Sequence, residues 1–196
     1  MIKDLFKRAC TEVCLPKKML YCFIPICIIM MFYPSDMKYY QSREKNKGIF
    51  VYSIEHYVRY VNTAAQAILP IIYRDPIGIA QACMVGASTT IAVHSLKRIF
   101  DKITIFGTRL GERPYNKNSS HNIPSGHCAM ASSAMYFVYR RYGCKHLYYL
   151  LPITALTMYA RLALKAHTVS AVASGCLVCI IAAAFFTSEY FSKNKK

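Results

Sequence analysis

Apolar residues are grouped along this chain in six blocks, and polar, charged segments separate them. Within a block the apolar residues are nearly continuous, rather than recurring every three or four positions as on one face of a surface helix. The third block is long enough for a helix that crosses a bilayer. We therefore expect an all-α polytopic membrane protein, a bundle of six transmembrane helices. The blocks are Met19–Tyr33, Tyr57–Tyr73, Ile77–Leu96, His127–Tyr139, Leu147–Ala160 and His167–Thr187.

The polar segments complete a simple domain plan. Residues 1–18 form a basic N-terminal segment, residues 19–187 the six-helix domain and residues 188–196 a basic C-terminal tail. The longest polar stretch, 97–126, is a loop rich in Lys, Arg, Gly and Pro, and we expect it to carry the chemistry.

The first apolar block is compatible with a cleaved signal peptide or with an uncleaved membrane helix. The basic region before it is long, and the block ends in Phe32-Tyr33-Pro34 without the small residues of a cleavage site. We favour an uncleaved, rather short first membrane helix.

Composition agrees with the membrane interpretation. The chain of 196 residues is 55% hydrophobic, yet its formal net charge is +16. Such an apolar chain is not a disordered basic tail. Apolar blocks also argue against a soluble nucleic-acid binder, so we expect no nucleic-acid partner. The basic residues are instead suited to anionic lipid headgroups or to anionic substrates.

The nine cysteines do not indicate a disulfide framework, because most of them lie inside apolar blocks. Cys176 and Cys179 have the spacing of a redox or zinc pair, but their flanks are aliphatic and no second pair accompanies them. We expect no metal ligands and no cofactor.

Six helices place both termini on one side of a membrane. With the termini inside, 12 Lys and Arg lie on the inner side and 13 on the outer side, so the positive-inside rule does not decide the orientation. The rule indicates an orientation only if the basic groups of the 97–126 loop and Arg161 are present for catalysis and are therefore left out of the count.

Candidate catalytic residues fall at helix ends on one expected face. Several cations there would trap an anion, and Arg side chains match phosphate oxygens in pairs. A helix that begins after Ser125 and Gly126 offers a phosphate cradle, and two histidines supply a nucleophile and a proton donor. The candidates are Lys97, Lys102, Arg109, Arg113, Ser125, Gly126, His127, Arg161 and His167.

Each of these residues also has a simpler interpretation. Ser125 can cap a helix, a histidine can be an interfacial residue, and basic residues that flank membrane helices usually anchor them to headgroups. The combination and its spacing distinguish the functional interpretation.

Pro124-Ser125-Gly126-His127 resembles the central motif of the phosphatidic acid phosphatase type 2 superfamily. The superfamily's third motif is Ser-Arg, five residues, His, three residues and Asp, and Arg161 and His167 match its spacing. Its first motif is Lys, six residues and Arg-Pro. Lys102 and Arg109 have the Lys-to-Arg spacing, Arg113-Pro114 supplies the Arg-Pro, and Lys97 is the other candidate for the lysine.

The resemblance implies a metal-independent phosphatase with the superfamily's six-helix plan. His167 would attack phosphorus and become phosphohistidine, and His127 would protonate the leaving oxygen. The phosphate and its transition-state charge would be held by Arg161, Lys97 or Lys102, Arg109, Arg113, Ser125 and Gly126.

Two positions depart from the third motif. Ala160 replaces the Ser, a change that we expect to reduce catalysis only slightly. Ala171 replaces the Asp that orients the nucleophilic histidine. His167 then needs another partner, for which Ser170, a backbone carbonyl and Glu112 are candidates. His121 is a weaker alternative nucleophile.

The run from Arg109 to His127, with Arg161 to His167, is most similar to the bacterial lipid A 1-phosphatase branch. This resemblance implies removal of the lipid A 1-phosphate at the periplasmic face of the inner membrane. It also implies resistance to cationic antimicrobial peptides and coupling to a phosphoethanolamine transferase. The alternatives are another lipid phosphate, such as undecaprenyl pyrophosphate or phosphatidylglycerophosphate, and a scaffold protein with an inactive phosphatase site.

Overall fold

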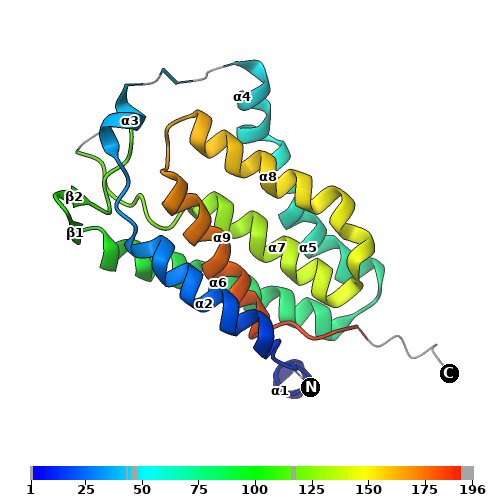
Figure 1. Ribbon diagram of the computed structural model, residues 1–196. Helices are drawn as coiled ribbons and strands as arrows, with labels where there is room; N and C mark the ends of the chain where they lie inside the picture. The colour runs from blue at the N-terminus through cyan, green and yellow to red at the C-terminus, as the bar shows by residue number, and fades with distance from the viewer. Residues whose placement is uncertain (1, 43, 46–47, 116–117, 191–196) are drawn as a thin grey trace.

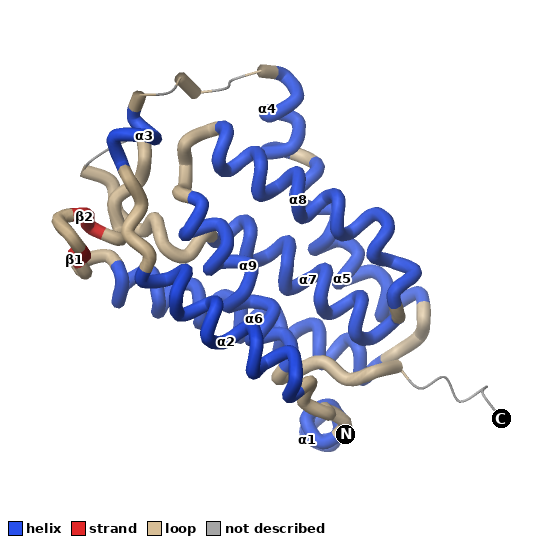
Figure 2. Tube along the Cα trace, in the orientation of Figure 1, coloured by secondary structure: helices blue, strands red, loops and turns tan. Residues whose placement is uncertain are grey.

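The computed structural model describes residues 2–42, 44–45, 48–115 and 118–190, and these are mostly helical (Figures 1 and 2). Short 3₁₀ turns at Val58–Tyr60 and Cys144–His146 precede two of the helices. The helices are α1 (Ile2–Thr11), α2 (Lys17–Phe32), α3 (Met37–Gln41), α4 (Ile49–His56), α5 (Val61–Ile72), α6 (Pro76–Phe100), α7 (Gly126–Tyr142), α8 (Leu147–Ala163) and α9 (Val169–Ala184).

Helices α7 and α9 form the centre of the bundle, and α2, α5, α6 and α8 pack around them (Figure 1). Small residues let the two central helices approach closely, as is common where membrane helices pack. The approach is tightest at Gly175, where a Cβ atom would lie 2.6 Å from the carbonyl oxygen of Ser125. Glycine at this position therefore holds α9 against the turn that begins α7.

The prediction of a mostly helical fold is confirmed, and each of the six apolar blocks contains a helix. The helix ends differ from the block ends. Helix α6 continues through Lys97 to Phe100, and α8 continues through Arg161. Basic residues in the last turn favour a helix terminus, so they extend these helices beyond the apolar residues.

Several elements were not expected from the sequence. Helix α1 lies in the basic N-terminal segment, and α3 lies in the polar stretch after the first apolar block. Helix α4 lies ahead of the second apolar block, and the 97–126 loop holds a small antiparallel hairpin of β1 (Thr104–Ile105) and β2 (Thr108–Arg109). The hairpin turn, Phe106-Gly107, has positive φ at both residues, as a two-residue hairpin turn requires.

Within the described residues, α6 is the one helix with both the length and the apolar character to cross a membrane. Its 25 residues give a length of about 37 Å at 1.5 Å per residue, against about 30 Å of hydrocarbon. Helices α2 and α9 have 16 residues each. The structure therefore does not establish the expected count of six spans.

The surface of α2 is nevertheless apolar. Ile24, Ile28 and Ile29 are 41%, 52% and 60% exposed. A contiguous apolar surface of this kind is uncommon on soluble monomers and suits contact with lipid.

Both ends of the described chain meet at one end of the bundle, where α6 begins and α7 ends (Figure 1). The side chain of Gln81 donates to the carbonyl of Ala9, at 2.8 Å, and to Ser188 Oγ, at 3.1 Å. Of the expected C-terminal tail, residues 191–196 lie outside the described residues.

A buried ion pair fastens this end of the bundle. Arg141 reaches Asp75 through Nε, at 2.5 Å, and through Nη2, at 2.7 Å, while its Nη1 donates to Gln81 and Ser188. Both side chains are almost fully buried, at 2% and 4% exposure. Every nitrogen of this guanidinium is therefore paired within the protein.

Candidate active site

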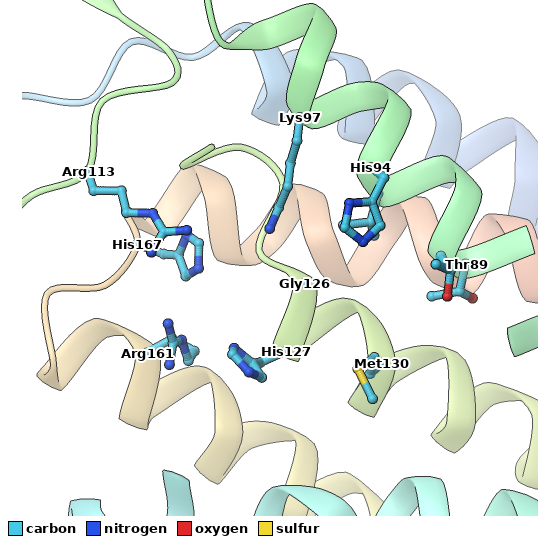
Figure 3. Close-up of a pocket in the computed structure, with 11 residues that line it drawn as sticks. Thr89, His94, Lys97, Arg113, Gly126, His127, Met130, Arg161 and His167 are labelled. Carbon is cyan, nitrogen blue, oxygen red and sulfur yellow. The ribbon is translucent and has the colours of Figure 1, made fainter. Parts of the chain in front are cut away.

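A cavity of about 250 Å³ opens at the other end of the bundle (Figure 3). It lies where α6 and α8 end and where α7 and the segment before α9 begin. The side chains of two histidines and three cations point into one common space in Figure 3. The sequence-predicted residues on its wall are Lys97, Arg113, Gly126, His127, Arg161 and His167.

His167 is held by a backbone carbonyl. Its Nδ1 lies 2.8 Å from the carbonyl oxygen of Asn122 and 3.3 Å from Asn122 Oδ1, and the residue is only 2% exposed. A carbonyl oxygen has no proton to give, so Nδ1 carries the proton in the neutral ring. The Nε2 lone pair is then unprotonated and available to an electrophile.

The surroundings of His167 keep its ring neutral. Burial lowers its pKa well below the usual value, and the nearby charges of Arg161, Arg113 and Lys97 lower it further. The hydrogen bond to Asn122 acts in the opposite direction but does not prevail. A neutral imidazole near pH 7 is the form that a nucleophile needs.

The start of α7 provides the second histidine. His127 lies in the first turn of this helix, directly after Gly126. A Cβ on Gly126 would lie 3.6 Å from Lys97 Nζ, so the lysine ammonium reaches over the helix start. Free amides of a first turn and a nearby ammonium together favour an anion.

Ser125 lies behind the cavity rather than on its wall. It is fully buried, and its amide donates to the carbonyl of Ala171 at 2.9 Å. Its side chain makes no capping hydrogen bond within the described part of α7. The simple capping interpretation therefore does not account for this hydroxyl.

The two arginines of the cavity are held from different sides. Arg113 Nε donates to the carbonyl of Ser120 at 3.1 Å, which fastens it to the loop. Arg161 Nη1 donates to Glu55 Oε1 at 2.6 Å, and Arg59 Nη1 reaches the same oxygen at 2.7 Å. Arg161 Nε is buried and has no hydrogen-bond partner among the described residues.

Lys102 and Arg109 are not brought to the cavity wall. Lys102 is exposed. Arg109 donates to the carbonyl of Ser119 and lies 3.6 Å from Asp101 Oδ1, which closes the loop on itself. Of the two candidate lysines, the cavity wall therefore includes Lys97.

Three features of the site were not found from the sequence. Asn122 holds His167 through a main-chain atom, for which a sequence has no signal. Glu55 lies 106 positions from Arg161. The sequence offered one signal for Glu55, because it is one of only nine Asp and Glu and lies at the edge of an apolar block. His94 lines the cavity from α6.

Away from the cations, the cavity wall is nearly neutral. Thr89 and His94 of α6 and Met130 of α7 lie in this part (Figure 3), and Thr90 also lines the cavity. The cavity thus has one cationic region and one region that suits an uncharged group.

Three further observations concern the described residues. They contain no group of three or more His, Cys, Asp and Glu of the kind that holds a metal ion. All nine cysteines are free thiols. His121 is half exposed, pairs with Asp101 at 3.9 Å and does not line the cavity.

Comparison with known proteins gives a consistent result. The chain is 42% identical over 134 residues to a protein named lipid A 1-phosphatase from Helicobacter pylori strain 26695, covering 68% of this chain and 70% of that protein. It is 34% identical over 123 residues to a lipid A 4'-phosphatase from strain J99, covering 62% of each. No solved structure matches.

A lipid A 1-phosphatase of strain J99 is 41% identical over 134 residues, which cover 68% of this chain and 69% of that protein. The family model of the PAP2 superfamily matches residues 78–195, from the start of α6 onward. This range includes all three histidines and all three cations of the cavity. The chain belongs to the PAP2 superfamily, whose abbreviation stands for phosphatidic acid phosphatase type 2.

Proposed function

We propose that this chain is a lipid phosphatase that removes the 1-phosphate of lipid A through a phosphohistidine intermediate. The observation that carries the proposal is the convergence of His127 and His167 with Lys97, Arg113 and Arg161 on one cavity. The membership of the superfamily and the names of the similar proteins support the same activity.

In the first step, His167 attacks the bound phosphate. The Nε2 lone pair forms a bond to phosphorus while the bond from phosphorus to the ester oxygen breaks. His127, which takes up a proton beside the phosphate anion, gives that proton to the leaving oxygen. Lys97, Arg113 and Arg161 hold the other phosphoryl oxygens, because phosphoryl transfer depends mainly on positioning and on charge stabilisation.

In the second step, water releases the phosphate. Neutral His127 takes a proton from the water as its oxygen bonds to phosphorus, and the phosphorus–nitrogen bond breaks. His167 regains its neutral state, and His127 regains the proton it needs for the next cycle. No metal ion or cofactor enters either step as we propose it.

The shape of the cavity supports a phosphate carried by a larger molecule. Sites for drug-sized ligands occupy roughly 300–1,000 Å³, so a cavity of about 250 Å³ suits a phosphoryl group with the first part of its alcohol. The neutral wall of Thr89 and Met130 would face that alcohol. The rest of a lipid would remain outside, against the apolar bundle surface.

The proposal includes a location. Helices α2, α5, α6, α7, α8 and α9 would form a multi-pass bundle of six spans in the inner membrane, with the chain termini in the cytoplasm. The end of α6 and the start of α7, which line the cavity, lie at the opposite end of the bundle from α1 (Figure 1), so the cavity would face the periplasm. Loss of the phosphate charge would weaken binding of cationic antimicrobial peptides and prepare the site for a phosphoethanolamine transferase.

Phosphate release by the purified full-length chain in detergent tests the function. We would compare lipid A with undecaprenyl pyrophosphate and phosphatidylglycerophosphate, in the presence and absence of EDTA. We expect release from lipid A that EDTA leaves intact, that vanadate inhibits, and that is lost in His167→Ala and in His127→Ala. Lost activity that zinc or magnesium restores would contradict the nucleophilic-histidine mechanism.

The position of the removed phosphate separates the remaining alternatives. Lipid A extracted from a host with and without the gene would be weighed and fragmented. We expect a product that lacks only the 1-phosphate. Loss of the 4'-phosphate would give this chain the activity named for its 34% identical relative. An unchanged mass, with no release from any purified lipid phosphate, would support the inactive scaffold instead.

A further inference from the structure

A buried chain of hydrogen bonds leads away from the proposed nucleophile. His167 Nδ1 contacts the Asn122 carbonyl and Oδ1, and Asn122 Nδ2 donates to Thr168 Oγ1 at 3.2 Å. The amide of Thr168 donates back to Asn122 Oδ1 at 3.3 Å. All three residues are 2% exposed or less, so the contacts are shielded from water.

The chain continues through two serines. Thr168 Oγ1 lies 3.0 Å from Ser170 Oγ, and Ser170 Oγ lies 3.0 Å from Ser35 Oγ. Ser35 and Ser170 are 8% and 3% exposed, and both line a second cavity, of about 500 Å³, beside the start of α9.

The direction of donation follows from the number of partners. Thr168 Oγ1 accepts from Asn122 Nδ2 and from the amide of Ala171, at 3.3 Å. A hydroxyl oxygen has two lone pairs and one proton. With both lone pairs occupied, its proton goes to Ser170 Oγ, and the Ser170 proton then goes to Ser35. The chain therefore fixes the Asn122 amide with Nδ2 toward Thr168 and Oδ1 toward His167.

This arrangement occupies the role left open by Ala171, which has no polar side chain where the third motif has its Asp. We infer that Asn122, fixed by Thr168, Ser170 and Ser35, is the positioning residue of His167. The inference rests on the proposed function. Asn122 holds the imidazole ring in the Nδ1–H form with Nε2 toward the cavity, and as a neutral amide it places no negative charge beside the phosphate.

Selectively ¹⁵N-histidine-labelled full-length chain in detergent gives a readout that does not need activity. The nitrogen shifts distinguish the two ring tautomers, and His167→Gln assigns the signal. Asn122→Ala keeps the main-chain carbonyl but removes Oδ1 and the side-chain contacts with Thr168 that fix the carbonyl. We therefore expect the Nδ1–H form for His167 in the wild type and a mixture of tautomers in Asn122→Ala. An unchanged signal in Asn122→Ala would overturn the inference.

Kinetics on the lipid phosphate that the wild type hydrolyses fastest provide the second readout. Because a misplaced catalytic group costs up to about 100-fold, we expect Asn122→Ala to lower kcat by roughly 10–100-fold at an unchanged KM. Asn122→Asp keeps the acceptor and adds a charge that favours the imidazolium. We expect it to retain most of kcat and to move the acid limb of the pH profile upward.

A matched pair of serine variants keeps the inference testable if Asn122→Ala does not fold. Ser170→Ala removes the acceptor of the Thr168 proton, and since one hydrogen bond is worth about 0.5–1.5 kcal/mol we expect kcat to fall by about 2–10-fold. Ser174 is buried on the same helix and donates to the carbonyl of Ala171 at 3.2 Å, away from the chain that leads to His167, so Ser174→Ala should leave kcat unchanged.

The outcomes separate the two proposals. Equal kcat in Ser170→Ala and Ser174→Ala, with an unchanged His167 tautomer, would overturn the positioning chain while leaving the phosphatase intact. A wild type that releases no phosphate from any lipid phosphate would overturn the proposed function. The tautomer measurement would still report whether Asn122 holds His167.

Discussion

Two buried arginines at opposite ends of the bundle have different surroundings. Arg141 at the end of α7 has all three guanidinium nitrogens paired, two of them with the single carboxylate of Asp75. Arg161 at the end of α8 has one nitrogen on Glu55, and its Nε has no partner among the described residues. Both side chains are nearly excluded from water, at 2% and 8% exposure.

The difference indicates different roles. A buried charge is tolerated when its hydrogen bonds are satisfied, and Arg141 meets this condition within the protein. Arg161 meets it only in part and lies on the wall of a cavity that also contains Lys97 and Arg113. Arg141 is therefore suited to holding the fold, and Arg161 to holding an anion that arrives from outside.

The largest expected effect comes from removing each arginine in turn. Arg161→Ala should fold and lose about 10³-fold in kcat/KM, because it removes charge stabilisation from the transition state. Arg141→Ala leaves Asp75 buried and unpaired, which costs roughly 3–5 kcal/mol of stability. Phosphate release per folded molecule and thermal unfolding in detergent measure the two effects.

The comparison fails if the effects are exchanged. An Arg161→Ala protein that unfolds at much lower temperature, with normal activity per folded molecule, would make Arg161 a structural residue. An Arg141→Ala protein that is stable but inactive would place Arg141 in an unrecognised functional site.

Two lysines at the active end provide the next test. Lys97 lines the cavity and Lys102 is exposed. Lys97→Met should lower kcat/KM by about 10–100-fold, since a hydrogen bond to a charged group is worth about 1.5–3 kcal/mol. Lys102→Met should change it by less than about twofold, as expected for a solvated surface charge. The reverse ranking would show that Lys102 and Arg109 move to the phosphate.

The sequence could predict features that depend on neighbouring residues in the chain, but not those that depend on contacts between distant residues. Apolar blocks specify helices locally, so the helical bundle was predictable, whereas the ends of α6 and α8 were not, because charged last turns lengthen them. The residues of the Pro-Ser-Gly-His and Arg…His motifs could be selected by spacing, and four of them, Gly126, His127, Arg161 and His167, line one cavity.

The supporting contacts were beyond sequence reasoning. The backbone carbonyl that holds His167 was one of three candidate partners, but no pattern identifies Asn122 as the residue that provides it. Glu55 comes from α4, a helix outside the part of the chain that matches the family model. Its contact with Arg161 exists only because α4 packs against α8.

Glu55 permits a finer test of the active end. Glu55→Gln removes the negative charge shared by Arg161 and Arg59, and it leaves a neutral oxygen in the same place. The cavity becomes more cationic, so we expect a lower KM. Because Arg161 is held less firmly and product phosphate more tightly, we expect kcat to fall by about tenfold, the change that 1.4 kcal/mol produces.

Glu189→Gln is the matched control, since Glu189 pairs with Arg140 at 3.1 Å at the opposite end of the bundle. It makes the same change of charge far from the cavity, and both kinetic constants should remain at the wild-type values. If kcat and KM also remained at the wild-type values in Glu55→Gln, Arg161 would be positioned without its carboxylate partner.

The smallest expected effect is a shift in pH dependence. The pKa of His167 lies well below its usual value because of burial and because Arg161, Arg113 and Lys97 are near. Activity that needs the neutral ring is thus retained as pH falls through 6.5 and is lost only when the ring is protonated. Arg113→Gln removes one of these charges, so the pKa rises and the acid limb of kcat/KM moves upward by less than about one unit.

Arg109→Gln provides the comparison for that limb. Arg109 lies in the same loop, but it pairs with Ser119 and Asp101 rather than lining the cavity. The substrate's own ionisation is common to both variants, so a difference between them comes from the enzyme. An acid limb that moves equally in both would mean that the net charge of the loop sets the protonation of His167. An acid limb that moves only in Arg113→Gln would mean that the cation at the cavity wall sets the protonation of His167.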